Sequence, residues 1–82
     1  MAHVVCEVEP GMASLTRFAI VKDLNGRRES LQIDADFLTV ENGQNYLPVG
    51  VVYRDPEKVL IELPTEADSG TNRLWVSPLS IR

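Results

Sequence analysis

The stretch from Thr16 to Ile33 reads TRFAIVK, DLNG, RRESLQI, so two β-rich runs flank an Asn-Gly dipeptide. Asn and Gly tolerate the positive φ angles of tight turns, and this pattern predicts two antiparallel strands joined near Asn25-Gly26. In the second run Leu31 and Ile33 alternate with polar residues, as in a strand with one buried face. The stretch therefore indicates a β-hairpin, and an all-β fold for the chain.

The chain that follows repeats this pattern. A second Asn-Gly, Asn42-Gly43, precedes an expected strand over residues 45–53, in which Leu47, Val49, Val51 and Tyr53 share one face. Pro48 and Gly50 predict a bend in that strand, because a strand interior tolerates neither residue well. Shorter strands are expected at 59–63 and 73–76, and 80–81 would close the sheet after a tight turn at Ser77-Pro78-Leu79.

Residues 34–39 predict a single helical turn between the hairpin and the second Asn-Gly. Asp34 or Asp36 is expected to cap this turn through its side chain. Phe37 and Leu38 would then plug one end of the core.

These elements predict a small SH3-like barrel of about five short antiparallel strands with one short helical or 3₁₀ turn, since closure removes exposed strand edges. An OB-like barrel and an open meander are alternatives, because the likeness to SH3 rests on strand number and turn spacing alone. Residues 15–82 are expected to form this single domain. Residues 1–14 are expected to be a loose or disordered tail, with an extra edge strand as the alternative.

Composition narrows the class of protein. The 82 residues carry a net charge of −4 and only one cysteine, Cys6. An intramolecular disulfide is excluded, so we expect a cytoplasmic protein. The acidic balance argues against nucleic acid as a partner, and no apolar run predicts a membrane span.

No motif in the sequence predicts catalysis, and we expect a protein that is not an enzyme. His3 and Cys6 would supply only two ligands of the four that structural zinc requires, so no metal is expected, and nothing indicates a cofactor. The carboxylates Glu62, Glu66 and Asp68 have no apolar surroundings that would raise their pKa. We interpret them as solvated.

The long loop from Pro64 to Asn72 and its neighbours form the candidate binding region, because Trp, Tyr and Arg dominate binding hot spots. Its residues are Tyr53, Glu66, Asp68, Asn72, Arg73 and Trp75. The alternation of residues 73–76 puts Trp75 on the face opposite Leu74 and Val76, and thus on the surface, whereas a register shift of one residue would bury it. We expect it in the core, because a lone Trp in so small a domain is usually the largest contributor of buried area. We expect a non-enzymatic module that binds a protein partner or a second copy of itself. The alternative is a barrel that binds a peptide or small molecule at its loop face.

Overall fold

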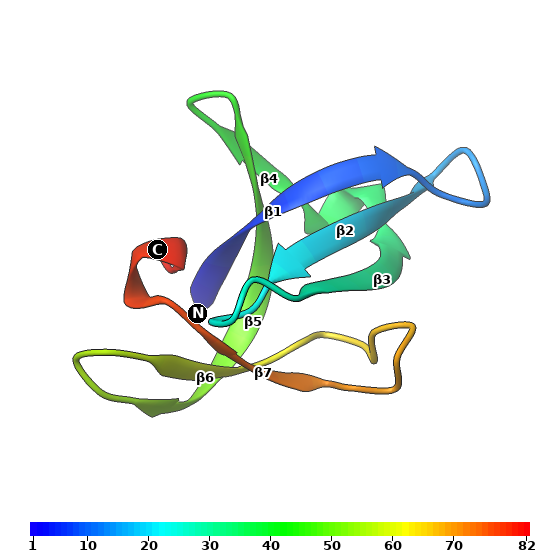
Figure 1. Cartoon of the computed structure of the whole chain (residues 1–82). Helices are drawn as coiled ribbons and strands as arrows, with labels where there is room; N and C mark the ends of the chain where they lie inside the picture. Colours follow the sequence, from blue (N-terminus) through cyan, green and yellow to red (C-terminus); the bar gives the residue numbers. More distant parts are fainter.

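The computed structural model describes all 82 residues and has the expected all-β fold (Figure 1). It contains two 3₁₀ turns and seven strands rather than about five. The elements are β1 (Ala2–Pro10), β2 (Thr16–Lys22), β3 (Arg28–Asp34), η1 (Ala35–Phe37), β4 (Thr39–Glu41), β5 (Gln44–Arg54), β6 (Val59–Glu62), β7 (Arg73–Val76) and η2 (Pro78–Ser80).

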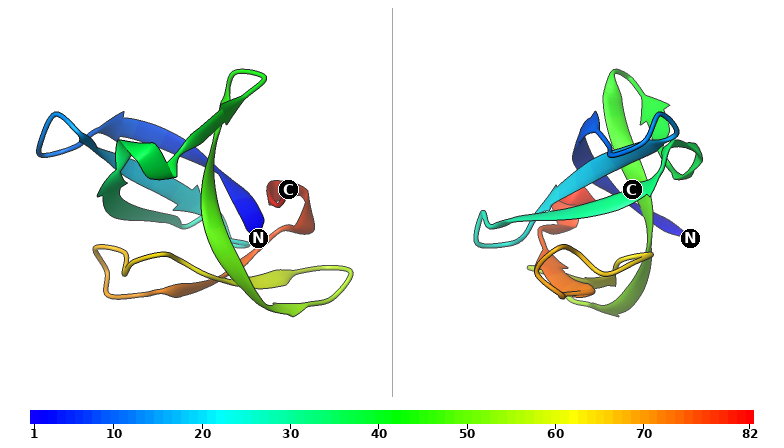
Figure 2. Two further views of the ribbon diagram at one scale, coloured as in Figure 1. Left: turned by 180° about the vertical axis from the view of Figure 1, so that it is seen from behind. Right: turned by 90° about the vertical axis from the view of Figure 1, so that its right-hand side faces the viewer.

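All strands belong to one antiparallel sheet in the order β3-β2-β1-β5-β6-β7, with β4 also paired to β5. The sheet curls into a half-barrel compatible with a small SH3-like barrel, in which the long, curved β5 runs from the layer of β1 to β3 to the layer of β6 and β7 (Figure 2). Two backbone hydrogen bonds join the layers at the open side. Leu24 N–H donates to Trp75 O (2.8 Å), and Asp68 N–H donates to Ser30 O (2.7 Å).

The predicted β2–β3 hairpin is confirmed, with Lys22 opposite Arg28 and Thr16 opposite Asp34. Its turn is fixed by Asp23, whose Oδ1 accepts hydrogen bonds from the N–H groups of Asn25 and Arg27. Leu31 and Ile33 are buried as expected.

The N-terminal segment differs from its expected form. Residues 2–10 are strand β1, so a loose tail is wrong for them. The edge-strand alternative is also wrong, because β1 lies between β2 and β5. The physical reason is burial, since Val4 and Cys6 pack in the core and His3 exchanges backbone hydrogen bonds with Arg82.

The bend in β5 falls where it changes partner, from β1 (up to Val49) to β6 (from Gly50 onward). Pro48 lies opposite His3, whose N–H and C=O bond to Arg82 instead. The pairing therefore needs no donor from Pro48.

A β-bulge follows the bend, because the register with β6 shifts between Val51 and Tyr53. Val51 pairs with the buried Ile61, whereas Tyr53 pairs with Leu60, which points to the other face. The extra residue reverses the alternation of side chains. Tyr53 therefore does not share the inward face of Leu47 and Val49.

The core is one cluster of fourteen buried residues, drawn from strands of both layers and from the long loop. Its fully buried members include Val4, Leu31, Leu47, Ile61 and Val76. The inward set predicted for residues 59–63, namely Val59, Ile61 and Leu63, is confirmed; Leu63 directly follows β6.

The helical turn exists as η1, but its expected side chains behave differently. Asp34 stands at the N-cap and makes no side-chain cap hydrogen bond, so the predicted capping is wrong. Phe37 is 51% exposed and does not plug the core, whereas Leu38 packs against it. The turn is too short to direct two adjacent side chains inward.

Candidate functional site

An aromatic pair lies on the outer face of the β5–β6–β7 layer. Tyr53 pairs with Leu60, and Leu60 pairs with Trp75, so the three residues form one row across the strands. Leu74 and Val76 are buried, which turns Trp75 outward. The expectation that Trp75 belongs to the core is therefore wrong, because its smaller neighbours on β7 take the inward positions.

The two rings contact each other directly. The ring centroids of Tyr53 and Trp75 lie 5.9 Å apart at an interplanar angle of 80°, an edge-to-face arrangement. Tyr53 is 53% exposed and Trp75 is half-buried. Lys58 completes the group, with its Nζ 4.3 Å from the centroid of the Trp75 ring. We call Tyr53, Lys58, Leu60 and Trp75 the aromatic face.

Arg73 and Glu62 form the next row of the same layer, since they pair with each other across β6 and β7. Arg73 Nε lies 3.2 Å from Glu62 Oε2, and both side chains are about half exposed. An ion pair this exposed adds little to stability. It gives the aromatic face a charged border.

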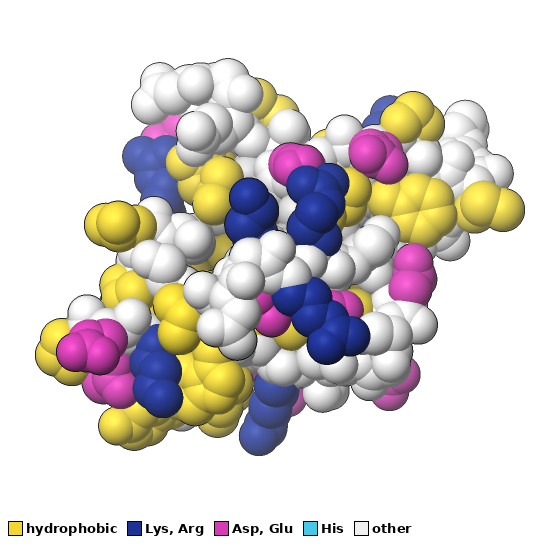
Figure 3. Space-filling view, in the orientation of Figure 1, with side chains coloured by type: hydrophobic (Ala, Val, Ile, Leu, Met, Phe, Trp, Pro, Cys, Tyr) yellow, Lys and Arg dark blue, Asp and Glu magenta, His cyan; other side chains and the backbone are white.

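Hydrophobic side chains gather at the lower left of the space-filling view, over the β5–β6 hairpin, with basic and acidic side chains beside them (Figure 3). This hairpin carries Val51, Val52 and Tyr53 as consecutive exposed apolar residues. Contiguous apolar surface with a polar rim is typical of interaction sites.

The remaining candidate residues lie elsewhere. Glu66, Asp68 and Asn72 are exposed in the long loop, at the end of the β6–β7 pair opposite the β5–β6 turn (Figure 1). The structure thus brings together Tyr53 and Trp75, with Arg73 one row away, and leaves the three loop residues apart from them.

The long loop is packed onto the barrel. Ala67 is buried, its N–H donates to Thr71 O (2.8 Å), and Gly70 adopts a φ of +90°. Leu63 N–H donates to Asn72 O (2.8 Å) at its base. The loop covers the core and does not extend freely into solvent.

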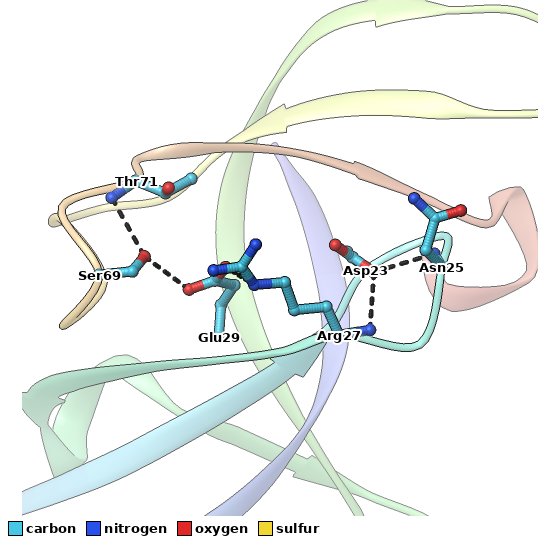
Figure 4. Close-up of polar contacts among 6 residues, drawn as sticks. All are labelled: Asp23, Asn25, Arg27, Glu29, Ser69 and Thr71. Atoms are coloured by element: carbon cyan, nitrogen blue, oxygen red, sulfur yellow. Dashed lines mark hydrogen bonds and ion pairs between the residues drawn. The ribbon is translucent and has the colours of Figure 1, made fainter.

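A buried carboxylate holds this loop, and the sequence interpretation missed it. Glu29 is 5% exposed and is the one buried charged residue. Its Oε1 accepts a hydrogen bond from Ser69 Oγ (2.7 Å), and its Oε2 lies 3.3 Å from Arg27 Nε (Figure 4). The sequence does contain a signal for this burial. Every second side chain of a strand points to the same face, so Glu29 lies on the inward face of Leu31 and Ile33.

A second polar group surrounds Arg82. Its guanidinium donates to Tyr46 Oη (3.1 Å) and lies 2.8 Å from Glu41 Oε1. These contacts raise the pKa of Arg82, first through the Tyr46 hydrogen bond and then through the Glu41 charge. His3 and Thr39 line the same small hollow of about 90 Å³. The charges of Arg82 and Glu41 balance each other.

The residues weighed as metal ligands do not form a site. Cys6 is buried, and desolvation raises the pKa of its thiol to about 11. At neutral pH the thiol is protonated, which disfavours metal binding and nucleophilic attack. No group of three or more His, Cys, Asp and Glu side chains comes together in the structure.

The largest hollow is an open groove of about 980 Å³ along the bend of β5. Phe37, Pro48, Val51 and Leu63 contribute apolar walls, and Arg54 and Glu62 contribute charges. It borders the β5–β6 hairpin without including Tyr53 or Trp75.

The structure contains no helix with the length and apolar character needed to cross a membrane. Comparisons with protein-family models, with curated proteins and with solved structures found no match for this chain.

Proposed function

We propose that this chain is a non-enzymatic protein-interaction module that contacts its partner through the aromatic face. The observation that carries the proposal is the pair of the exposed Tyr53 and the half-buried Trp75, with ring centroids 5.9 Å apart, on the outer side of the β5–β6–β7 layer. Tyr and Trp provide large contact areas with few rotatable bonds, and they are enriched at binding hot spots.

The local backbone supports this use of the surface. The β-bulge at Val52 turns Tyr53 outward, and the pairing of Leu60 with Tyr53 and Trp75 fixes both aromatic residues on the two strands that flank β6. Side chains on paired strands are better ordered than side chains on loops. A partner would therefore meet a surface that is already formed.

Affinity capture of the tagged chain from lysate of its source cells tests the proposal. The test variant is Tyr53→Ala with Trp75→Ala, after circular dichroism has confirmed its fold. The matched control is Val40→Ala with Leu79→Ala, which removes two exposed apolar side chains from other parts of the surface. We expect a partner that the aromatic variant loses and the control retains.

Two outcomes contradict the proposal. One is the recovery of no partner, and the other is a partner that the aromatic variant still binds. Recovery of the chain itself, lost in the aromatic variant, would identify the partner as a second copy.

The groove along the β5 bend favours a second candidate, a barrel that binds an extended peptide or a small apolar molecule. Phe37 and Val51 are exposed in its wall, and its volume of about 980 Å³ is that of a ligand site. In this case Phe37→Ala would abolish capture and the aromatic variant would retain it.

A further inference from the structure

We propose that the corner between Tyr53 and Trp75 binds the trimethylated ammonium group of a lysine side chain presented by the partner. This inference rests on the proposed function, because it assigns a ligand chemistry to the aromatic face. The observations are the placement of Lys58, the angle between the two rings and the charge of the chain.

The first observation is that the Trp75 ring already attracts an ammonium group. Lys58 Nζ lies 4.3 Å from the Trp75 centroid, within the distance of about 6 Å over which a ring quadrupole attracts a cation. Four arginines pair with carboxylates, whereas Lys58 pairs with none. The indole ring therefore holds this ammonium group without help from a carboxylate.

The second observation is the geometry of the rings. An interplanar angle of 80° means that Tyr53 and Trp75 stand nearly perpendicular to each other. A rounded cation in the angle between them can contact both rings. Lys58, which reaches in from the β5–β6 turn, is close to the Trp75 ring alone in the observed contacts.

The hydration of the two kinds of ligand favours an alkylated ammonium over an unmodified lysine. A primary ammonium is strongly hydrated, so its transfer to an aromatic surface is costly. Three methyl groups reduce this hydration and add apolar contact while the positive charge is kept. The net charge of −4 further favours a cationic ligand.

Lys58 can leave the Trp75 ring without a change in the backbone. Its hairpin turn is fixed by Asp55, whose Oδ1 accepts hydrogen bonds from the N–H groups of Glu57 (2.8 Å) and Lys58 (2.9 Å). Only the four-carbon side chain has to swing into solvent. Lys58 is thus an internal competitor for the ligand.

The test uses two matched probes and the full chain. The first probe is Nα-acetyl-trimethyllysine amide, and the second is its neutral analogue with a tert-butyl group in place of the trimethylammonium group. Binding is followed by Trp75 fluorescence and by the NMR signal of the Trp75 indole N–H. We expect the charged probe to bind and the neutral probe of the same shape to bind at least several-fold more weakly.

Two variants test the role assigned to each side chain. Lys58→Gln should tighten binding of the charged probe about fivefold, because it removes one competing cation–π contact. Tyr53→Leu should weaken binding by a similar factor, since it removes one aromatic wall and keeps an apolar side chain. The control is Lys22→Gln, which removes the only other lysine and should leave the affinity unchanged.

Equal affinity for the two probes, or no binding of the charged probe to either wild type or Lys58→Gln, would overturn the inference. If capture of a partner still depended on Trp75 in that case, the proposed interaction module would be supported and only the proposed ammonium ligand would be rejected. If the charged probe binds while lysate yields no partner, the ammonium site stands and the proposed function fails.

Discussion

Ser69 Oγ donates a 2.7 Å hydrogen bond to Oε1 of Glu29, forty residues earlier in the chain. Glu29 belongs to β3 and Ser69 to the long loop, so the bond joins the two layers of the half-barrel beside the backbone bond from Asp68 to Ser30. Ser69 Oγ also accepts from Thr71 N–H (3.4 Å). This contact makes the loop part of the folded domain.

We expect Ser69→Ala to lower the free energy of unfolding by about 1–2 kcal/mol, because a buried carboxylate loses a hydroxyl donor. Chemical denaturation measures this change. Hydrogen exchange at Asp68 N–H should also become faster, since the loop loses its side-chain anchor. Exposed Thr65→Ala in the same loop is the control, and equal effects of the two substitutions would contradict the assigned role of Ser69.

Gly11→Ala should destabilise the chain by about 1–3 kcal/mol. A Cβ at this position would lie 2.4 Å from Thr16 Oγ1 and 2.6 Å from Thr16 C, so the backbone would have to shift. Gly50→Ala is the matched control, because its Cβ would lie 3.8 Å from Glu62 Cβ, an ordinary contact. Thermal unfolding of both variants checks the prediction, and a stable Gly11→Ala protein would refute it.

A chain that begins at Met12 should not fold. It lacks β1, which joins β2 to β5 and contributes the fully buried Val4 to the core. Far-UV circular dichroism and NMR peak dispersion measure the loss, with the chain of residues 1–82 as the control. A dispersed spectrum from the truncated chain would show that the other strands form a core without β1.

The stability of the chain should fall between pH 9 and pH 11 through Cys6. Burial raises the pKa of its thiol from 9.0 to about 11. In this window the unfolded chain loses the thiol proton first, so rising pH favours unfolding by at most about 3 kcal/mol in total. The contribution is fully present below pH 9.

Denaturation at several pH values, compared with Cys6→Ala, isolates this effect from that of other groups that titrate in the same range. The variant should have the shallower decline. Identical pH profiles would show that the folded chain does not hold the thiol in its protonated form.

Much of the fold follows from the sequence because its signals are local. Asn25-Gly26 and the alternation at Leu31 and Ile33 specify the β2–β3 hairpin, and the positive φ angles of Asn42 and Gly43 match a tight hairpin turn. The inward set of β6 follows from alternation alone. Each of these features depends on neighbours in the chain, which any reader of the sequence can see.

The candidate site was only partly predictable. Tyr53, Arg73 and Trp75 stood out by residue type, but the alternation of β5 assigned Tyr53 to the inward face. The bulge at Val52 reverses that assignment, and it lies in the part of β5 that pairs with β6 after β5 has left β1. Lys58 was overlooked because its role depends on Trp75, seventeen residues later.

The sequence by itself thus determined the β2–β3 hairpin, the strands β5, β6 and β7 and the turns at the two Asn-Gly dipeptides, because backbone preferences and side-chain alternation act over a few residues. Only the tertiary structure decided that β1 is an interior strand, that Trp75 faces outward and that Glu29 is buried against Ser69. Those outcomes depend on which distant strand covers each face, and burial is a property of the assembled layers rather than of any single segment.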